Sequence, residues 1–233
     1  MRWQYKSIYG AYKLKIKMKE INLEEKNREF KNKEPAEILT RAKDEFGDSL
    51  VMTSSFGRYS TALLHKVTRI IPGIKVIFID TGYYPRKNYK FIDKVAREMN
   101  LNLKVFSAGR SRKMQETIKG KRWKKQGDDF MKFKNENKVE PLNRALKILN
   151  ARAWISGARR EESTRRRGFR YVMYDKNREI YRIYPILDWD KRKLQNYIMK
   201  NNLDTNLFYF DVCKGPEQRK ECGLHIFEKG SGI

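Results

Sequence analysis

Short, mostly apolar runs alternate with amphipathic helical patterns along most of this chain. The apolar runs, which are typical of buried strands, occur at 49–53, 75–79, 102–106, 153–156 and 181–184. Apolar residues recur at helical spacing over 35–46, 60–71, 85–100, 142–149 and 190–202. Because strands that alternate with helices form βαβ units, the pattern predicts an α/β fold: a Rossmann-like parallel sheet with helices on both faces.

Boundary signals support two of these helices. Pro35 stands at the first position of the first helix, and Gly47 follows its last residue. Either Asp188 or Asp190 is expected to cap the helix at 190–202.

Two stretches do not follow the alternation. Residues 1–33 form a basic N-terminal extension, and residues 110–138 are rich in lysine, glutamine and glycine. The second stretch predicts a mobile or partly helical excursion, because it has few apolar residues from which to build a core. We therefore expect an α/β domain over 34–212 and a C-terminal tail over 213–233.

The charge balance changes this picture, because the 233 residues hold 53 Lys and Arg against 28 Asp and Glu, a formal net charge of +25. A charge of this size favours a polyanionic partner, and nucleic acid is the usual one. Most of the excess falls in three segments, 1–33, 110–138 and 152–178, so it is local. The first two are mainly lysine, which is equally typical of a solvated surface. The third is rich in arginine, whose forked donors match phosphate or sulfate.

Composition also excludes several classes of protein. No apolar run reaches the length of a membrane span, and the N-terminus does not read as a secretory signal, so a cytoplasmic protein is expected. The two cysteines, Cys213 and Cys222, are too few for a disulfide framework or a four-cysteine iron–sulfur cluster. No metal site is predicted.

Residues that follow the predicted strands are the first candidates for ligand binding, because ligands of parallel sheets bind beyond the carboxyl ends of the strands. After the first strand, hydroxyls, a glycine and a helix start could cradle an oxyanion, although Ser60 could equally serve only as a helix cap. Asp80-Thr81-Gly82 after the second strand suits a nucleotide, but it is also a good turn. Gly157 and the paired Arg159 and Arg160 follow the fourth strand.

Near the C-terminus, Cys222 has basic neighbours and is followed by a glycine. Positive charge favours the thiolate, which is the nucleophilic form of cysteine. A free cysteine is more often an inert, small apolar residue. The polar surroundings of Cys222 in the sequence nevertheless favour the nucleophile.

Taken together, the motifs resemble those of the 3′-phosphoadenosine 5′-phosphosulfate (PAPS) reductases, in family order, over about residues 35–225. The resemblance rests on Thr53-Ser-Ser-Phe-Gly57, Ile79-Asp-Thr-Gly82, Lys138-Val-Glu-Pro141, Gly157-Ala-Arg-Arg-Glu-Glu-Ser163, Pro185-Ile-Leu-Asp-Trp189 and Glu221-Cys-Gly-Leu-His225. It implies an adenine nucleotide α-hydrolase-like fold and the reduction of PAPS to sulfite and adenosine 3′,5′-bisphosphate.

The resemblance also implies a role for each motif. Cys222 would attack the sulfate sulfur and become an S-sulfocysteine, which thioredoxin or glutaredoxin would resolve, and His225 would assist it or have a structural role. The residues expected to bind substrate are Ser54, Ser55, Phe56, Gly57, Arg58, Ser60, Asp80, Thr81, Gly82, Lys138, Gly157, Arg159, Arg160 and Ser163. The family association further implies a homodimer with PAPS as its substrate.

Departures from the related adenylylsulfate (APS) reductases narrow the prediction. Asn135-Glu136-Asn137 stands where those enzymes carry a Cys-Cys pair, so no 4Fe–4S cluster is expected and PAPS is favoured over APS. Cys213 could act as a resolving thiol or could be incidental. Three alternatives remain: APS reductase-like activity, a sulfur-transfer protein acting on tRNA or DNA, and a non-catalytic nucleic-acid-binding module. The motifs disfavour the two hypotheses that involve nucleic acid. The adenylating sulfur-transfer proteins have a Ser-Gly-Gly-x-Asp-Ser loop, which Ser55-Phe-Gly-Arg-Tyr-Ser60 does not match.

Overall fold

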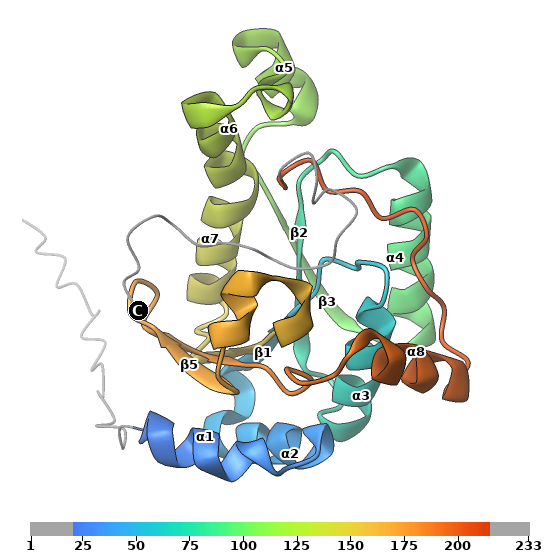
Figure 1. The fold of residues 1–233 in the computed structure, drawn as a ribbon. Helices are drawn as coiled ribbons and strands as arrows, with labels where there is room; N and C mark the ends of the chain where they lie inside the picture. Colours follow the sequence, from blue (N-terminus) through green and yellow to red (C-terminus); the bar gives the residue numbers. More distant parts are fainter. Residues whose placement is uncertain (1–20, 215–233) are drawn as a thin grey trace, which may run out of the picture.

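The computed structural model describes residues 21–214, which fold around one sheet (Figure 1). The strands of this part of the chain are β1 (Leu50–Thr53), β2 (Lys75–Asp80), β3 (Asn102–Ser107), β4 (Ala153–Ile155), β5 (Val172–Asp175) and β6 (Ile180–Ile183). They form a six-stranded sheet in the order β3-β2-β1-β4-β6-β5. Every neighbouring pair is parallel except β5 with β6. The predicted parallel sheet is confirmed, and an antiparallel strand at one edge is added to it.

The α-helices of the described part are α1 (Leu23–Lys31), α2 (Pro35–Phe46), α3 (Ser60–Ile70), α4 (Arg86–Glu98), α5 (Arg112–Lys119), α6 (Gly127–Lys134), α7 (Glu140–Ile148) and α8 (Lys191–Lys200). The predicted boundary residues act as expected in two of them. Pro35 is the first residue of α2 and Gly47, with φ of 50°, ends it. Asp190, rather than Asp188, caps α8 by accepting a hydrogen bond of 2.6 Å from the Lys193 amide.

Side chains alternate between the two faces of the sheet and form two apolar cores. Met52, Val76 and Ile155 belong to the larger core, which the apolar faces of α2, α3, α4 and α8 complete. Val51, Ile77 and Trp154 point to the other face, where α7 covers them. Helices thus lie on both faces of the sheet, as the sequence predicts.

Helix α1 packs on the α/β body, although the sequence suggested that the first 33 residues are a separate extension. Phe30 is buried in the larger core. The Asn27 side-chain amide donates to the Val172 carbonyl oxygen at 2.8 Å, and its oxygen accepts from the Val172 amide at 2.9 Å. Asn27 therefore supplies the hydrogen bonds that a further strand would give to the edge strand β5. The boundary predicted after residue 33 does not separate α1 from the domain.

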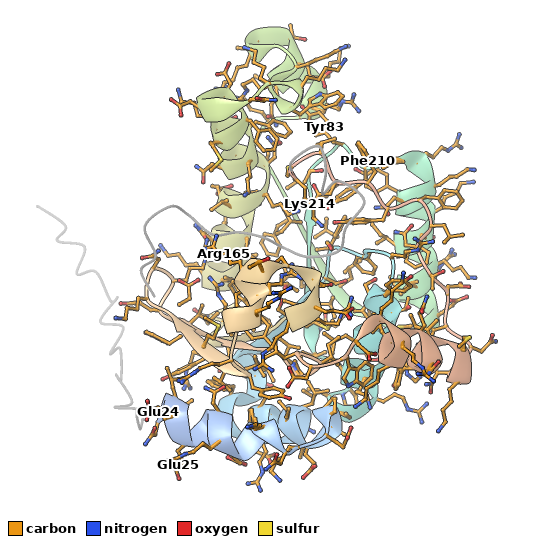
Figure 2. The ribbon with its side chains drawn as sticks, viewed as in Figure 1. Glu24, Glu25, Tyr83, Arg165, Phe210 and Lys214 are labelled. Atoms are coloured by element: carbon orange, nitrogen blue, oxygen red, sulfur yellow. The ribbon has the colours of Figure 1, made fainter. Side chains whose placement is uncertain are left out.

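Residues 110–138 form helices, so of the two alternatives for this stretch the helical one is confirmed. In Figure 1, α5 and α6 lie at the opposite end of the molecule from α1 and α2. A short 3₁₀ helix (η2, Arg122–Lys124) joins them, and a π-helical turn (η3, Asn135–Val139) connects α6 to α7. Helix α6 and η2 contribute to a third apolar cluster, which also contains Tyr83, Val212 and Cys213. Tyr83 and Phe210, both in or against this cluster, are labelled in Figure 2.

Buried polar groups hold this helical region together. The Gln115 and Asn137 side-chain amides exchange two hydrogen bonds, of 2.8 Å and 3.0 Å, and both side chains are buried. Arg122, only 5% exposed, donates to Glu136 at 2.6 Å. Because these groups satisfy one another, a segment with few apolar residues can still pack.

No helix among residues 21–214 is long and apolar enough to cross a membrane.

Candidate active site

A pocket opens between the carboxyl ends of β1 and β4. Within the sheet, β2 and β3 lie on one side of β1 and β4 lies on its other side, so the strand order reverses between β1 and β4. Ligands of open α/β sheets bind at such a reversal. The enclosed volume is about 70 Å³, which is space for a few water molecules or one oxyanion-sized group. The predicted residues that line it are Ser54, Ser55, Gly57, Ser60, Gly157 and Arg159.

The start of α3 gives the pocket its hydrogen-bond donors. Ser60 is the first residue of α3, and no side chain caps this helix. The alternative interpretation of Ser60 as a simple helix cap is therefore wrong. Its hydroxyl is buried and has no hydrogen-bond partner among the described residues. A helix N-terminus favours negative charge, and a buried hydroxyl without a partner costs free energy, so a ligand or a water is expected here.

The backbone of the loop after β1 is held in an unusual conformation. Phe56 has φ of 49°, which is uncommon for a residue other than glycine, and its side chain is fully buried. Its ring packs edge-on against Phe78, with the ring centroids 5.5 Å apart. The Ser54 hydroxyl accepts from the Phe56 amide at 3.1 Å. Phe56 thus anchors the loop in the core, and it does not line the pocket.

Asn206 fastens the same loop from a distant part of the chain. Its side-chain amide donates to the Phe56 carbonyl oxygen at 2.7 Å and to the Asn88 side chain. Its backbone amide donates to the Arg58 carbonyl oxygen at 3.0 Å. Because Asn206 is only 1% exposed, water cannot replace these bonds.

Substitution of Asn206 by alanine is expected to loosen the loop and so weaken substrate binding. The change leaves the buried Phe56 and Asn88 oxygens without their donor, which costs about 1–3 kcal/mol. Steady-state kinetics should show a KM increase larger than the loss in kcat. Asn32→Ala is the control, since Asn32 is exposed, stands just beyond α1 and has φ of −107°, which alanine adopts without strain. Unchanged kinetics in Asn206→Ala would contradict this role.

Arg159 reaches the pocket but is already engaged. It is 6% exposed, pairs with Glu161, donates to Glu162 at 3.3 Å, and donates to the Trp189 carbonyl oxygen at 3.1 Å. Glu162 also lines the pocket. The Arg159 guanidinium is therefore held in one orientation by its partners, and part of its charge is compensated before any ligand arrives.

Gly157 lies at the carboxyl end of β4, where the loop after this strand passes α3. A Cβ atom at this position would lie 3.4 Å from Leu63 Cδ2 in α3, at the short end of ordinary van der Waals contact. Both residues line the pocket, so α3 and the loop after β4 form facing walls.

Asp80, Thr81 and Gly82 end the neighbouring strand β2 but do not line the pocket. The Asp80 carboxylate accepts from the Gly82 amide at 2.8 Å and from the Tyr89 hydroxyl at 2.7 Å. Thr81 is buried and accepts from the Tyr83 amide at 3.3 Å. Gly82 has φ of 74°, which a turn of this kind requires. These three residues thus form the turn that their sequence predicts as an alternative. The Asp80 carboxylate is partly exposed at the edge of the sheet where a nucleotide would lie.

Lys138 lies on η3 and forms a buried ion pair with Asp211. Burial alone would raise the pKa of Asp211, but the Lys138 ammonium holds that pKa below its usual value. Burial lowers the pKa of the nearby Lys134, and the Lys138 charge lowers it further. η3 packs against β2, so the Lys138–Asp211 pair lies beside this strand of the sheet.

Three other predicted residues lie elsewhere. Arg58 is exposed, with its guanidinium 5.7 Å from the Tyr59 ring. Arg160 pairs with Asp188 on the other side of the loop from Arg159. The Ser163 hydroxyl accepts from the Arg166 amide at 3.4 Å and so caps a short 3₁₀ helix (η5, Thr164–Gly168). Cys222 and His225 lie outside the described residues.

Cys213 does not have the properties of a reactive thiol. It is 1% exposed, and burial raises the pKa of its thiol. The charge of Asp211 raises this pKa further. A neutral, buried thiol is a poor nucleophile, which favours the interpretation of Cys213 as an incidental cysteine.

Several pocket residues escaped sequence reasoning. Ser156 follows β4 and Glu162 stands within a motif that the sequence singled out, so both could have been found from their neighbours. Asn206 and Asp211 are different, because they approach the site only through folding and carry no local signal.

A mostly parallel sheet with an oxyanion-sized pocket at its point of strand reversal defines an α/β protein of the nucleotide-binding kind. Residues 49–214 match the family model described as phosphoadenosine phosphosulfate reductase domain. The chain belongs to this family.

Individual relatives carry the same name. A phosphoadenosine 5′-phosphosulfate reductase of Buchnera aphidicola is 41% identical over 189 residues, which cover 80% of this chain and 76% of the relative. The enzyme of that name from Synechocystis is 38% identical over 182 residues, 78% of this chain and 72% of the relative. The enzyme of that name from Escherichia coli O157:H7 is 39% identical over 183 residues, which cover 78% of this chain and 74% of the relative.

Solved structures agree on the fold. The PAPS reductase of Candida auris in complex with phosphate superposes with a TM-score of 0.71 at 24% identity, over 81% of this chain and 90% of that one. An FMN adenylyltransferase of Candida glabrata, in complex with FMN and an ATP analogue, superposes with a TM-score of 0.57 at 12% identity, over 84% of this chain and 64% of that one. The expectation of an adenine nucleotide α-hydrolase-like fold is confirmed.

Proposed function

We propose that this chain reduces PAPS to sulfite and adenosine 3′,5′-bisphosphate. The observation that carries the proposal is the buried Ser60 hydroxyl without a described partner, at the uncapped start of α3 and at the strand reversal. Family membership adds the substrate, since relatives 38–41% identical are named for it.

The pocket suits the phosphosulfate end of PAPS. Ser54, Ser55 and Ser60 supply hydroxyls, Gly57 keeps the backbone close, and Arg159 supplies a fixed positive charge. PAPS carries roughly four negative charges, so the basic residues around the sheet edge favour it over a neutral ligand. The enclosed volume of about 70 Å³ holds only the oxyanion group, and the adenosine end would lie outside it, toward Asp80 and Thr81.

Cys222 is proposed as the nucleophile. Its thiolate attacks the sulfate sulfur, the bond from that sulfur to the 5′-phosphate oxygen breaks, and adenosine 3′,5′-bisphosphate leaves with the electron pair. A dithiol of thioredoxin or glutaredoxin then attacks Cys222 Sγ and releases sulfite. Its second thiol resolves the mixed disulfide, so that the partner dithiol is oxidised by two electrons and sulfate sulfur is reduced to sulfite. His225 would orient the thiolate or protonate the leaving oxygen, and the family association extends to a homodimer.

The test is sulfite release by the purified full chain with PAPS, thioredoxin and a reductant. Sulfite should form with PAPS and at a much lower rate with APS. Ser60→Ala should lower kcat/KM about 10- to 100-fold, since a hydrogen bond to a charged group contributes about 1.5–3 kcal/mol. Thr40→Ala, an exposed hydroxyl on α2, is the matched control. Absence of sulfite with either donor would refute the proposal.

A further inference from the structure

A second cleft, separate from the pocket at β1 and β4, lies between α1 and the loop that leads from η4 (Arg160–Glu162) to β5. Its volume is about 380 Å³, within the range of small-ligand sites. The lining residues are Glu24, Asn27, Arg28, Lys31, Arg160, Arg170, Tyr171 and Asp188. Four cations thus face two carboxylates across one opening.

Helix α1 provides one wall, and its position is fixed. Positions 24, 28 and 31 follow helical spacing and share one face. The Asn27 bonds to Val172 and the burial of Phe30 lock this face toward the loop. Glu24, labelled in Figure 2, belongs to the same face.

The opposite wall is rigid because of Arg160. Its guanidinium donates to the Phe169 carbonyl oxygen at 2.9 Å and 3.2 Å, pairs with Asp188, and lies 5.6 Å from the Tyr171 ring centroid. The Tyr171 hydroxyl donates to Asp188 at 2.8 Å. Burial, and after it this hydrogen bond, raise the pKa of Tyr171 to about 12, so it remains a neutral donor. Asp188 is therefore the partner of two groups within the wall.

The other three cations of the lining, Arg28, Lys31 and Arg170, are exposed and share the cleft with the carboxylate of Glu24. Among residues 21–214, Arg28, Lys31 and Arg170 make no ion pair. Arg28 and Lys31 stand in the last turn of α1, where the helix dipole favours them. Arg160 is paired with Asp188, but four cations against two carboxylates still leave the cleft lining with a net positive charge, which favours an anion.

We propose that this cleft binds a small ligand that carries a phosphate or sulfate group with at least two negative charges. Arg28, Lys31 and Arg170 would donate to its oxygens, and the braced Arg160 would offer a preorganised guanidinium edge. The ligand is either a free inorganic anion or the anionic group of a nucleotide. The cleft is distinct from the proposed PAPS pocket, because Arg159 faces that pocket whereas Arg160 lines this cleft.

Calorimetric titration of the full chain with inorganic pyrophosphate, at a constant ionic strength of about 0.15 M, tests the site. The titrations use the Ser60→Ala background, which weakens anion binding in the proposed PAPS pocket and leaves the cleft lining intact. In this background Arg28→Gln/Arg170→Gln should bind pyrophosphate at least about tenfold more weakly than the Ser60→Ala parent. The control Arg69→Gln/Arg192→Gln removes the same charge from exposed positions on α3 and α8 and should change binding less than about twofold.

Titration with adenosine 3′,5′-bisphosphate alone distinguishes the two sources of the anion. Loss of one nucleotide site per chain in Arg28→Gln/Arg170→Gln identifies a nucleotide ligand, and the same number of sites in the variant and the unaltered chain identifies the inorganic anion. Equal pyrophosphate affinity in the cleft variant and in the control, or an equal loss in both, would overturn the proposal. Binding is measured without turnover, so this result is independent of whether the chain releases sulfite.

Discussion

Replacement of Cys222 by serine is expected to abolish sulfite release from PAPS altogether. A serine hydroxyl has a far higher pKa than a thiol and forms no sulfonated intermediate that a dithiol can resolve. Mass spectrometry after mixing with PAPS alone should show one added sulfonate on Cys222 in the unaltered chain and none in the variant. Sulfite release by Cys222→Ser at the unaltered rate would remove Cys222 from the mechanism.

Cys213→Ala is the matched control, because it removes the other thiol of the chain. Burial keeps the Cys213 thiol protonated, so the variant should retain sulfite release with thioredoxin as donor. Accumulation of the sulfonated enzyme in Cys213→Ala would instead show that Cys213 resolves the intermediate. The pair of variants thus separates the two cysteines by function.

Local patterns predicted the central sheet well, because its strands are apolar and its helices amphipathic. The strand β5 was not predicted. Only four residues long, it is an edge strand whose exposed Tyr174 and half-buried Met173 give no clear alternation. It is held by pairing with β6 and by the Asn27 side chain, and neither contact can be inferred from residues 172–175 alone.

The segment 110–138 shows a second limit of prediction from sequence, because buried polar contacts stabilise it and composition does not reveal them. Its composition indicates too few apolar residues for a core, yet Gln115, Asn137 and Arg122 are buried. Their stability depends on exact partners, such as Glu136 for Arg122, which composition does not reveal. Aromatic contacts add to it, for the Tyr83 and Phe133 ring centroids lie 5.2 Å apart.

The arginine-rich segment has more than one role. Of its members, Arg159 lines the pocket, Arg160 braces the second cleft, and Arg166 is buried against Glu162. Net charge indicates an anionic partner, but it does not separate cations that could bind a ligand from cations that hold loops. Only the ion pairs of the folded chain make that distinction.

Sequence reasoning located the pocket because strand ends carry its residues, and these are local features. Ser54, Ser60 and Arg159 follow directly from that rule. Asn206 lies 150 positions from the Phe56 carbonyl that it holds, and Asp211 lies 73 positions from Lys138. Such partners are set by the way α4, η3 and the segment after α8 meet in three dimensions.

The Lys138–Asp211 pair leads to the second large expected effect. Lys138→Met leaves a fully buried carboxylate without its counterion, so the free energy of unfolding at pH 7 should fall by about 3–5 kcal/mol. The melting temperature should drop by about 10 °C, as measured by circular dichroism. Lys134→Met is the control, because Lys134 lies one turn away and no ion pair involving it is found among residues 21–214.

The pH dependence gives this prediction its sign. In the unaltered chain the pKa of Asp211 lies below its unfolded value of about 3.9, so the pair stabilises above that pH and its contribution disappears as the pH falls through the folded pKa. In Lys138→Met the ammonium is gone and the weaker effects of the Lys214 charge and the Cys213 amide remain, so the pKa of Asp211 rises and its protonation relieves the penalty. The stability difference should therefore shrink from pH 7 toward pH 4; a constant difference would contradict the buried-charge explanation. Lys138→Met/Asp211→Leu should recover part of the melting temperature, because it removes the buried carboxylate but also the acceptor of the Cys213 amide. If kcat/KM for PAPS then stays as low as in Lys138→Met, Lys138 also binds the substrate.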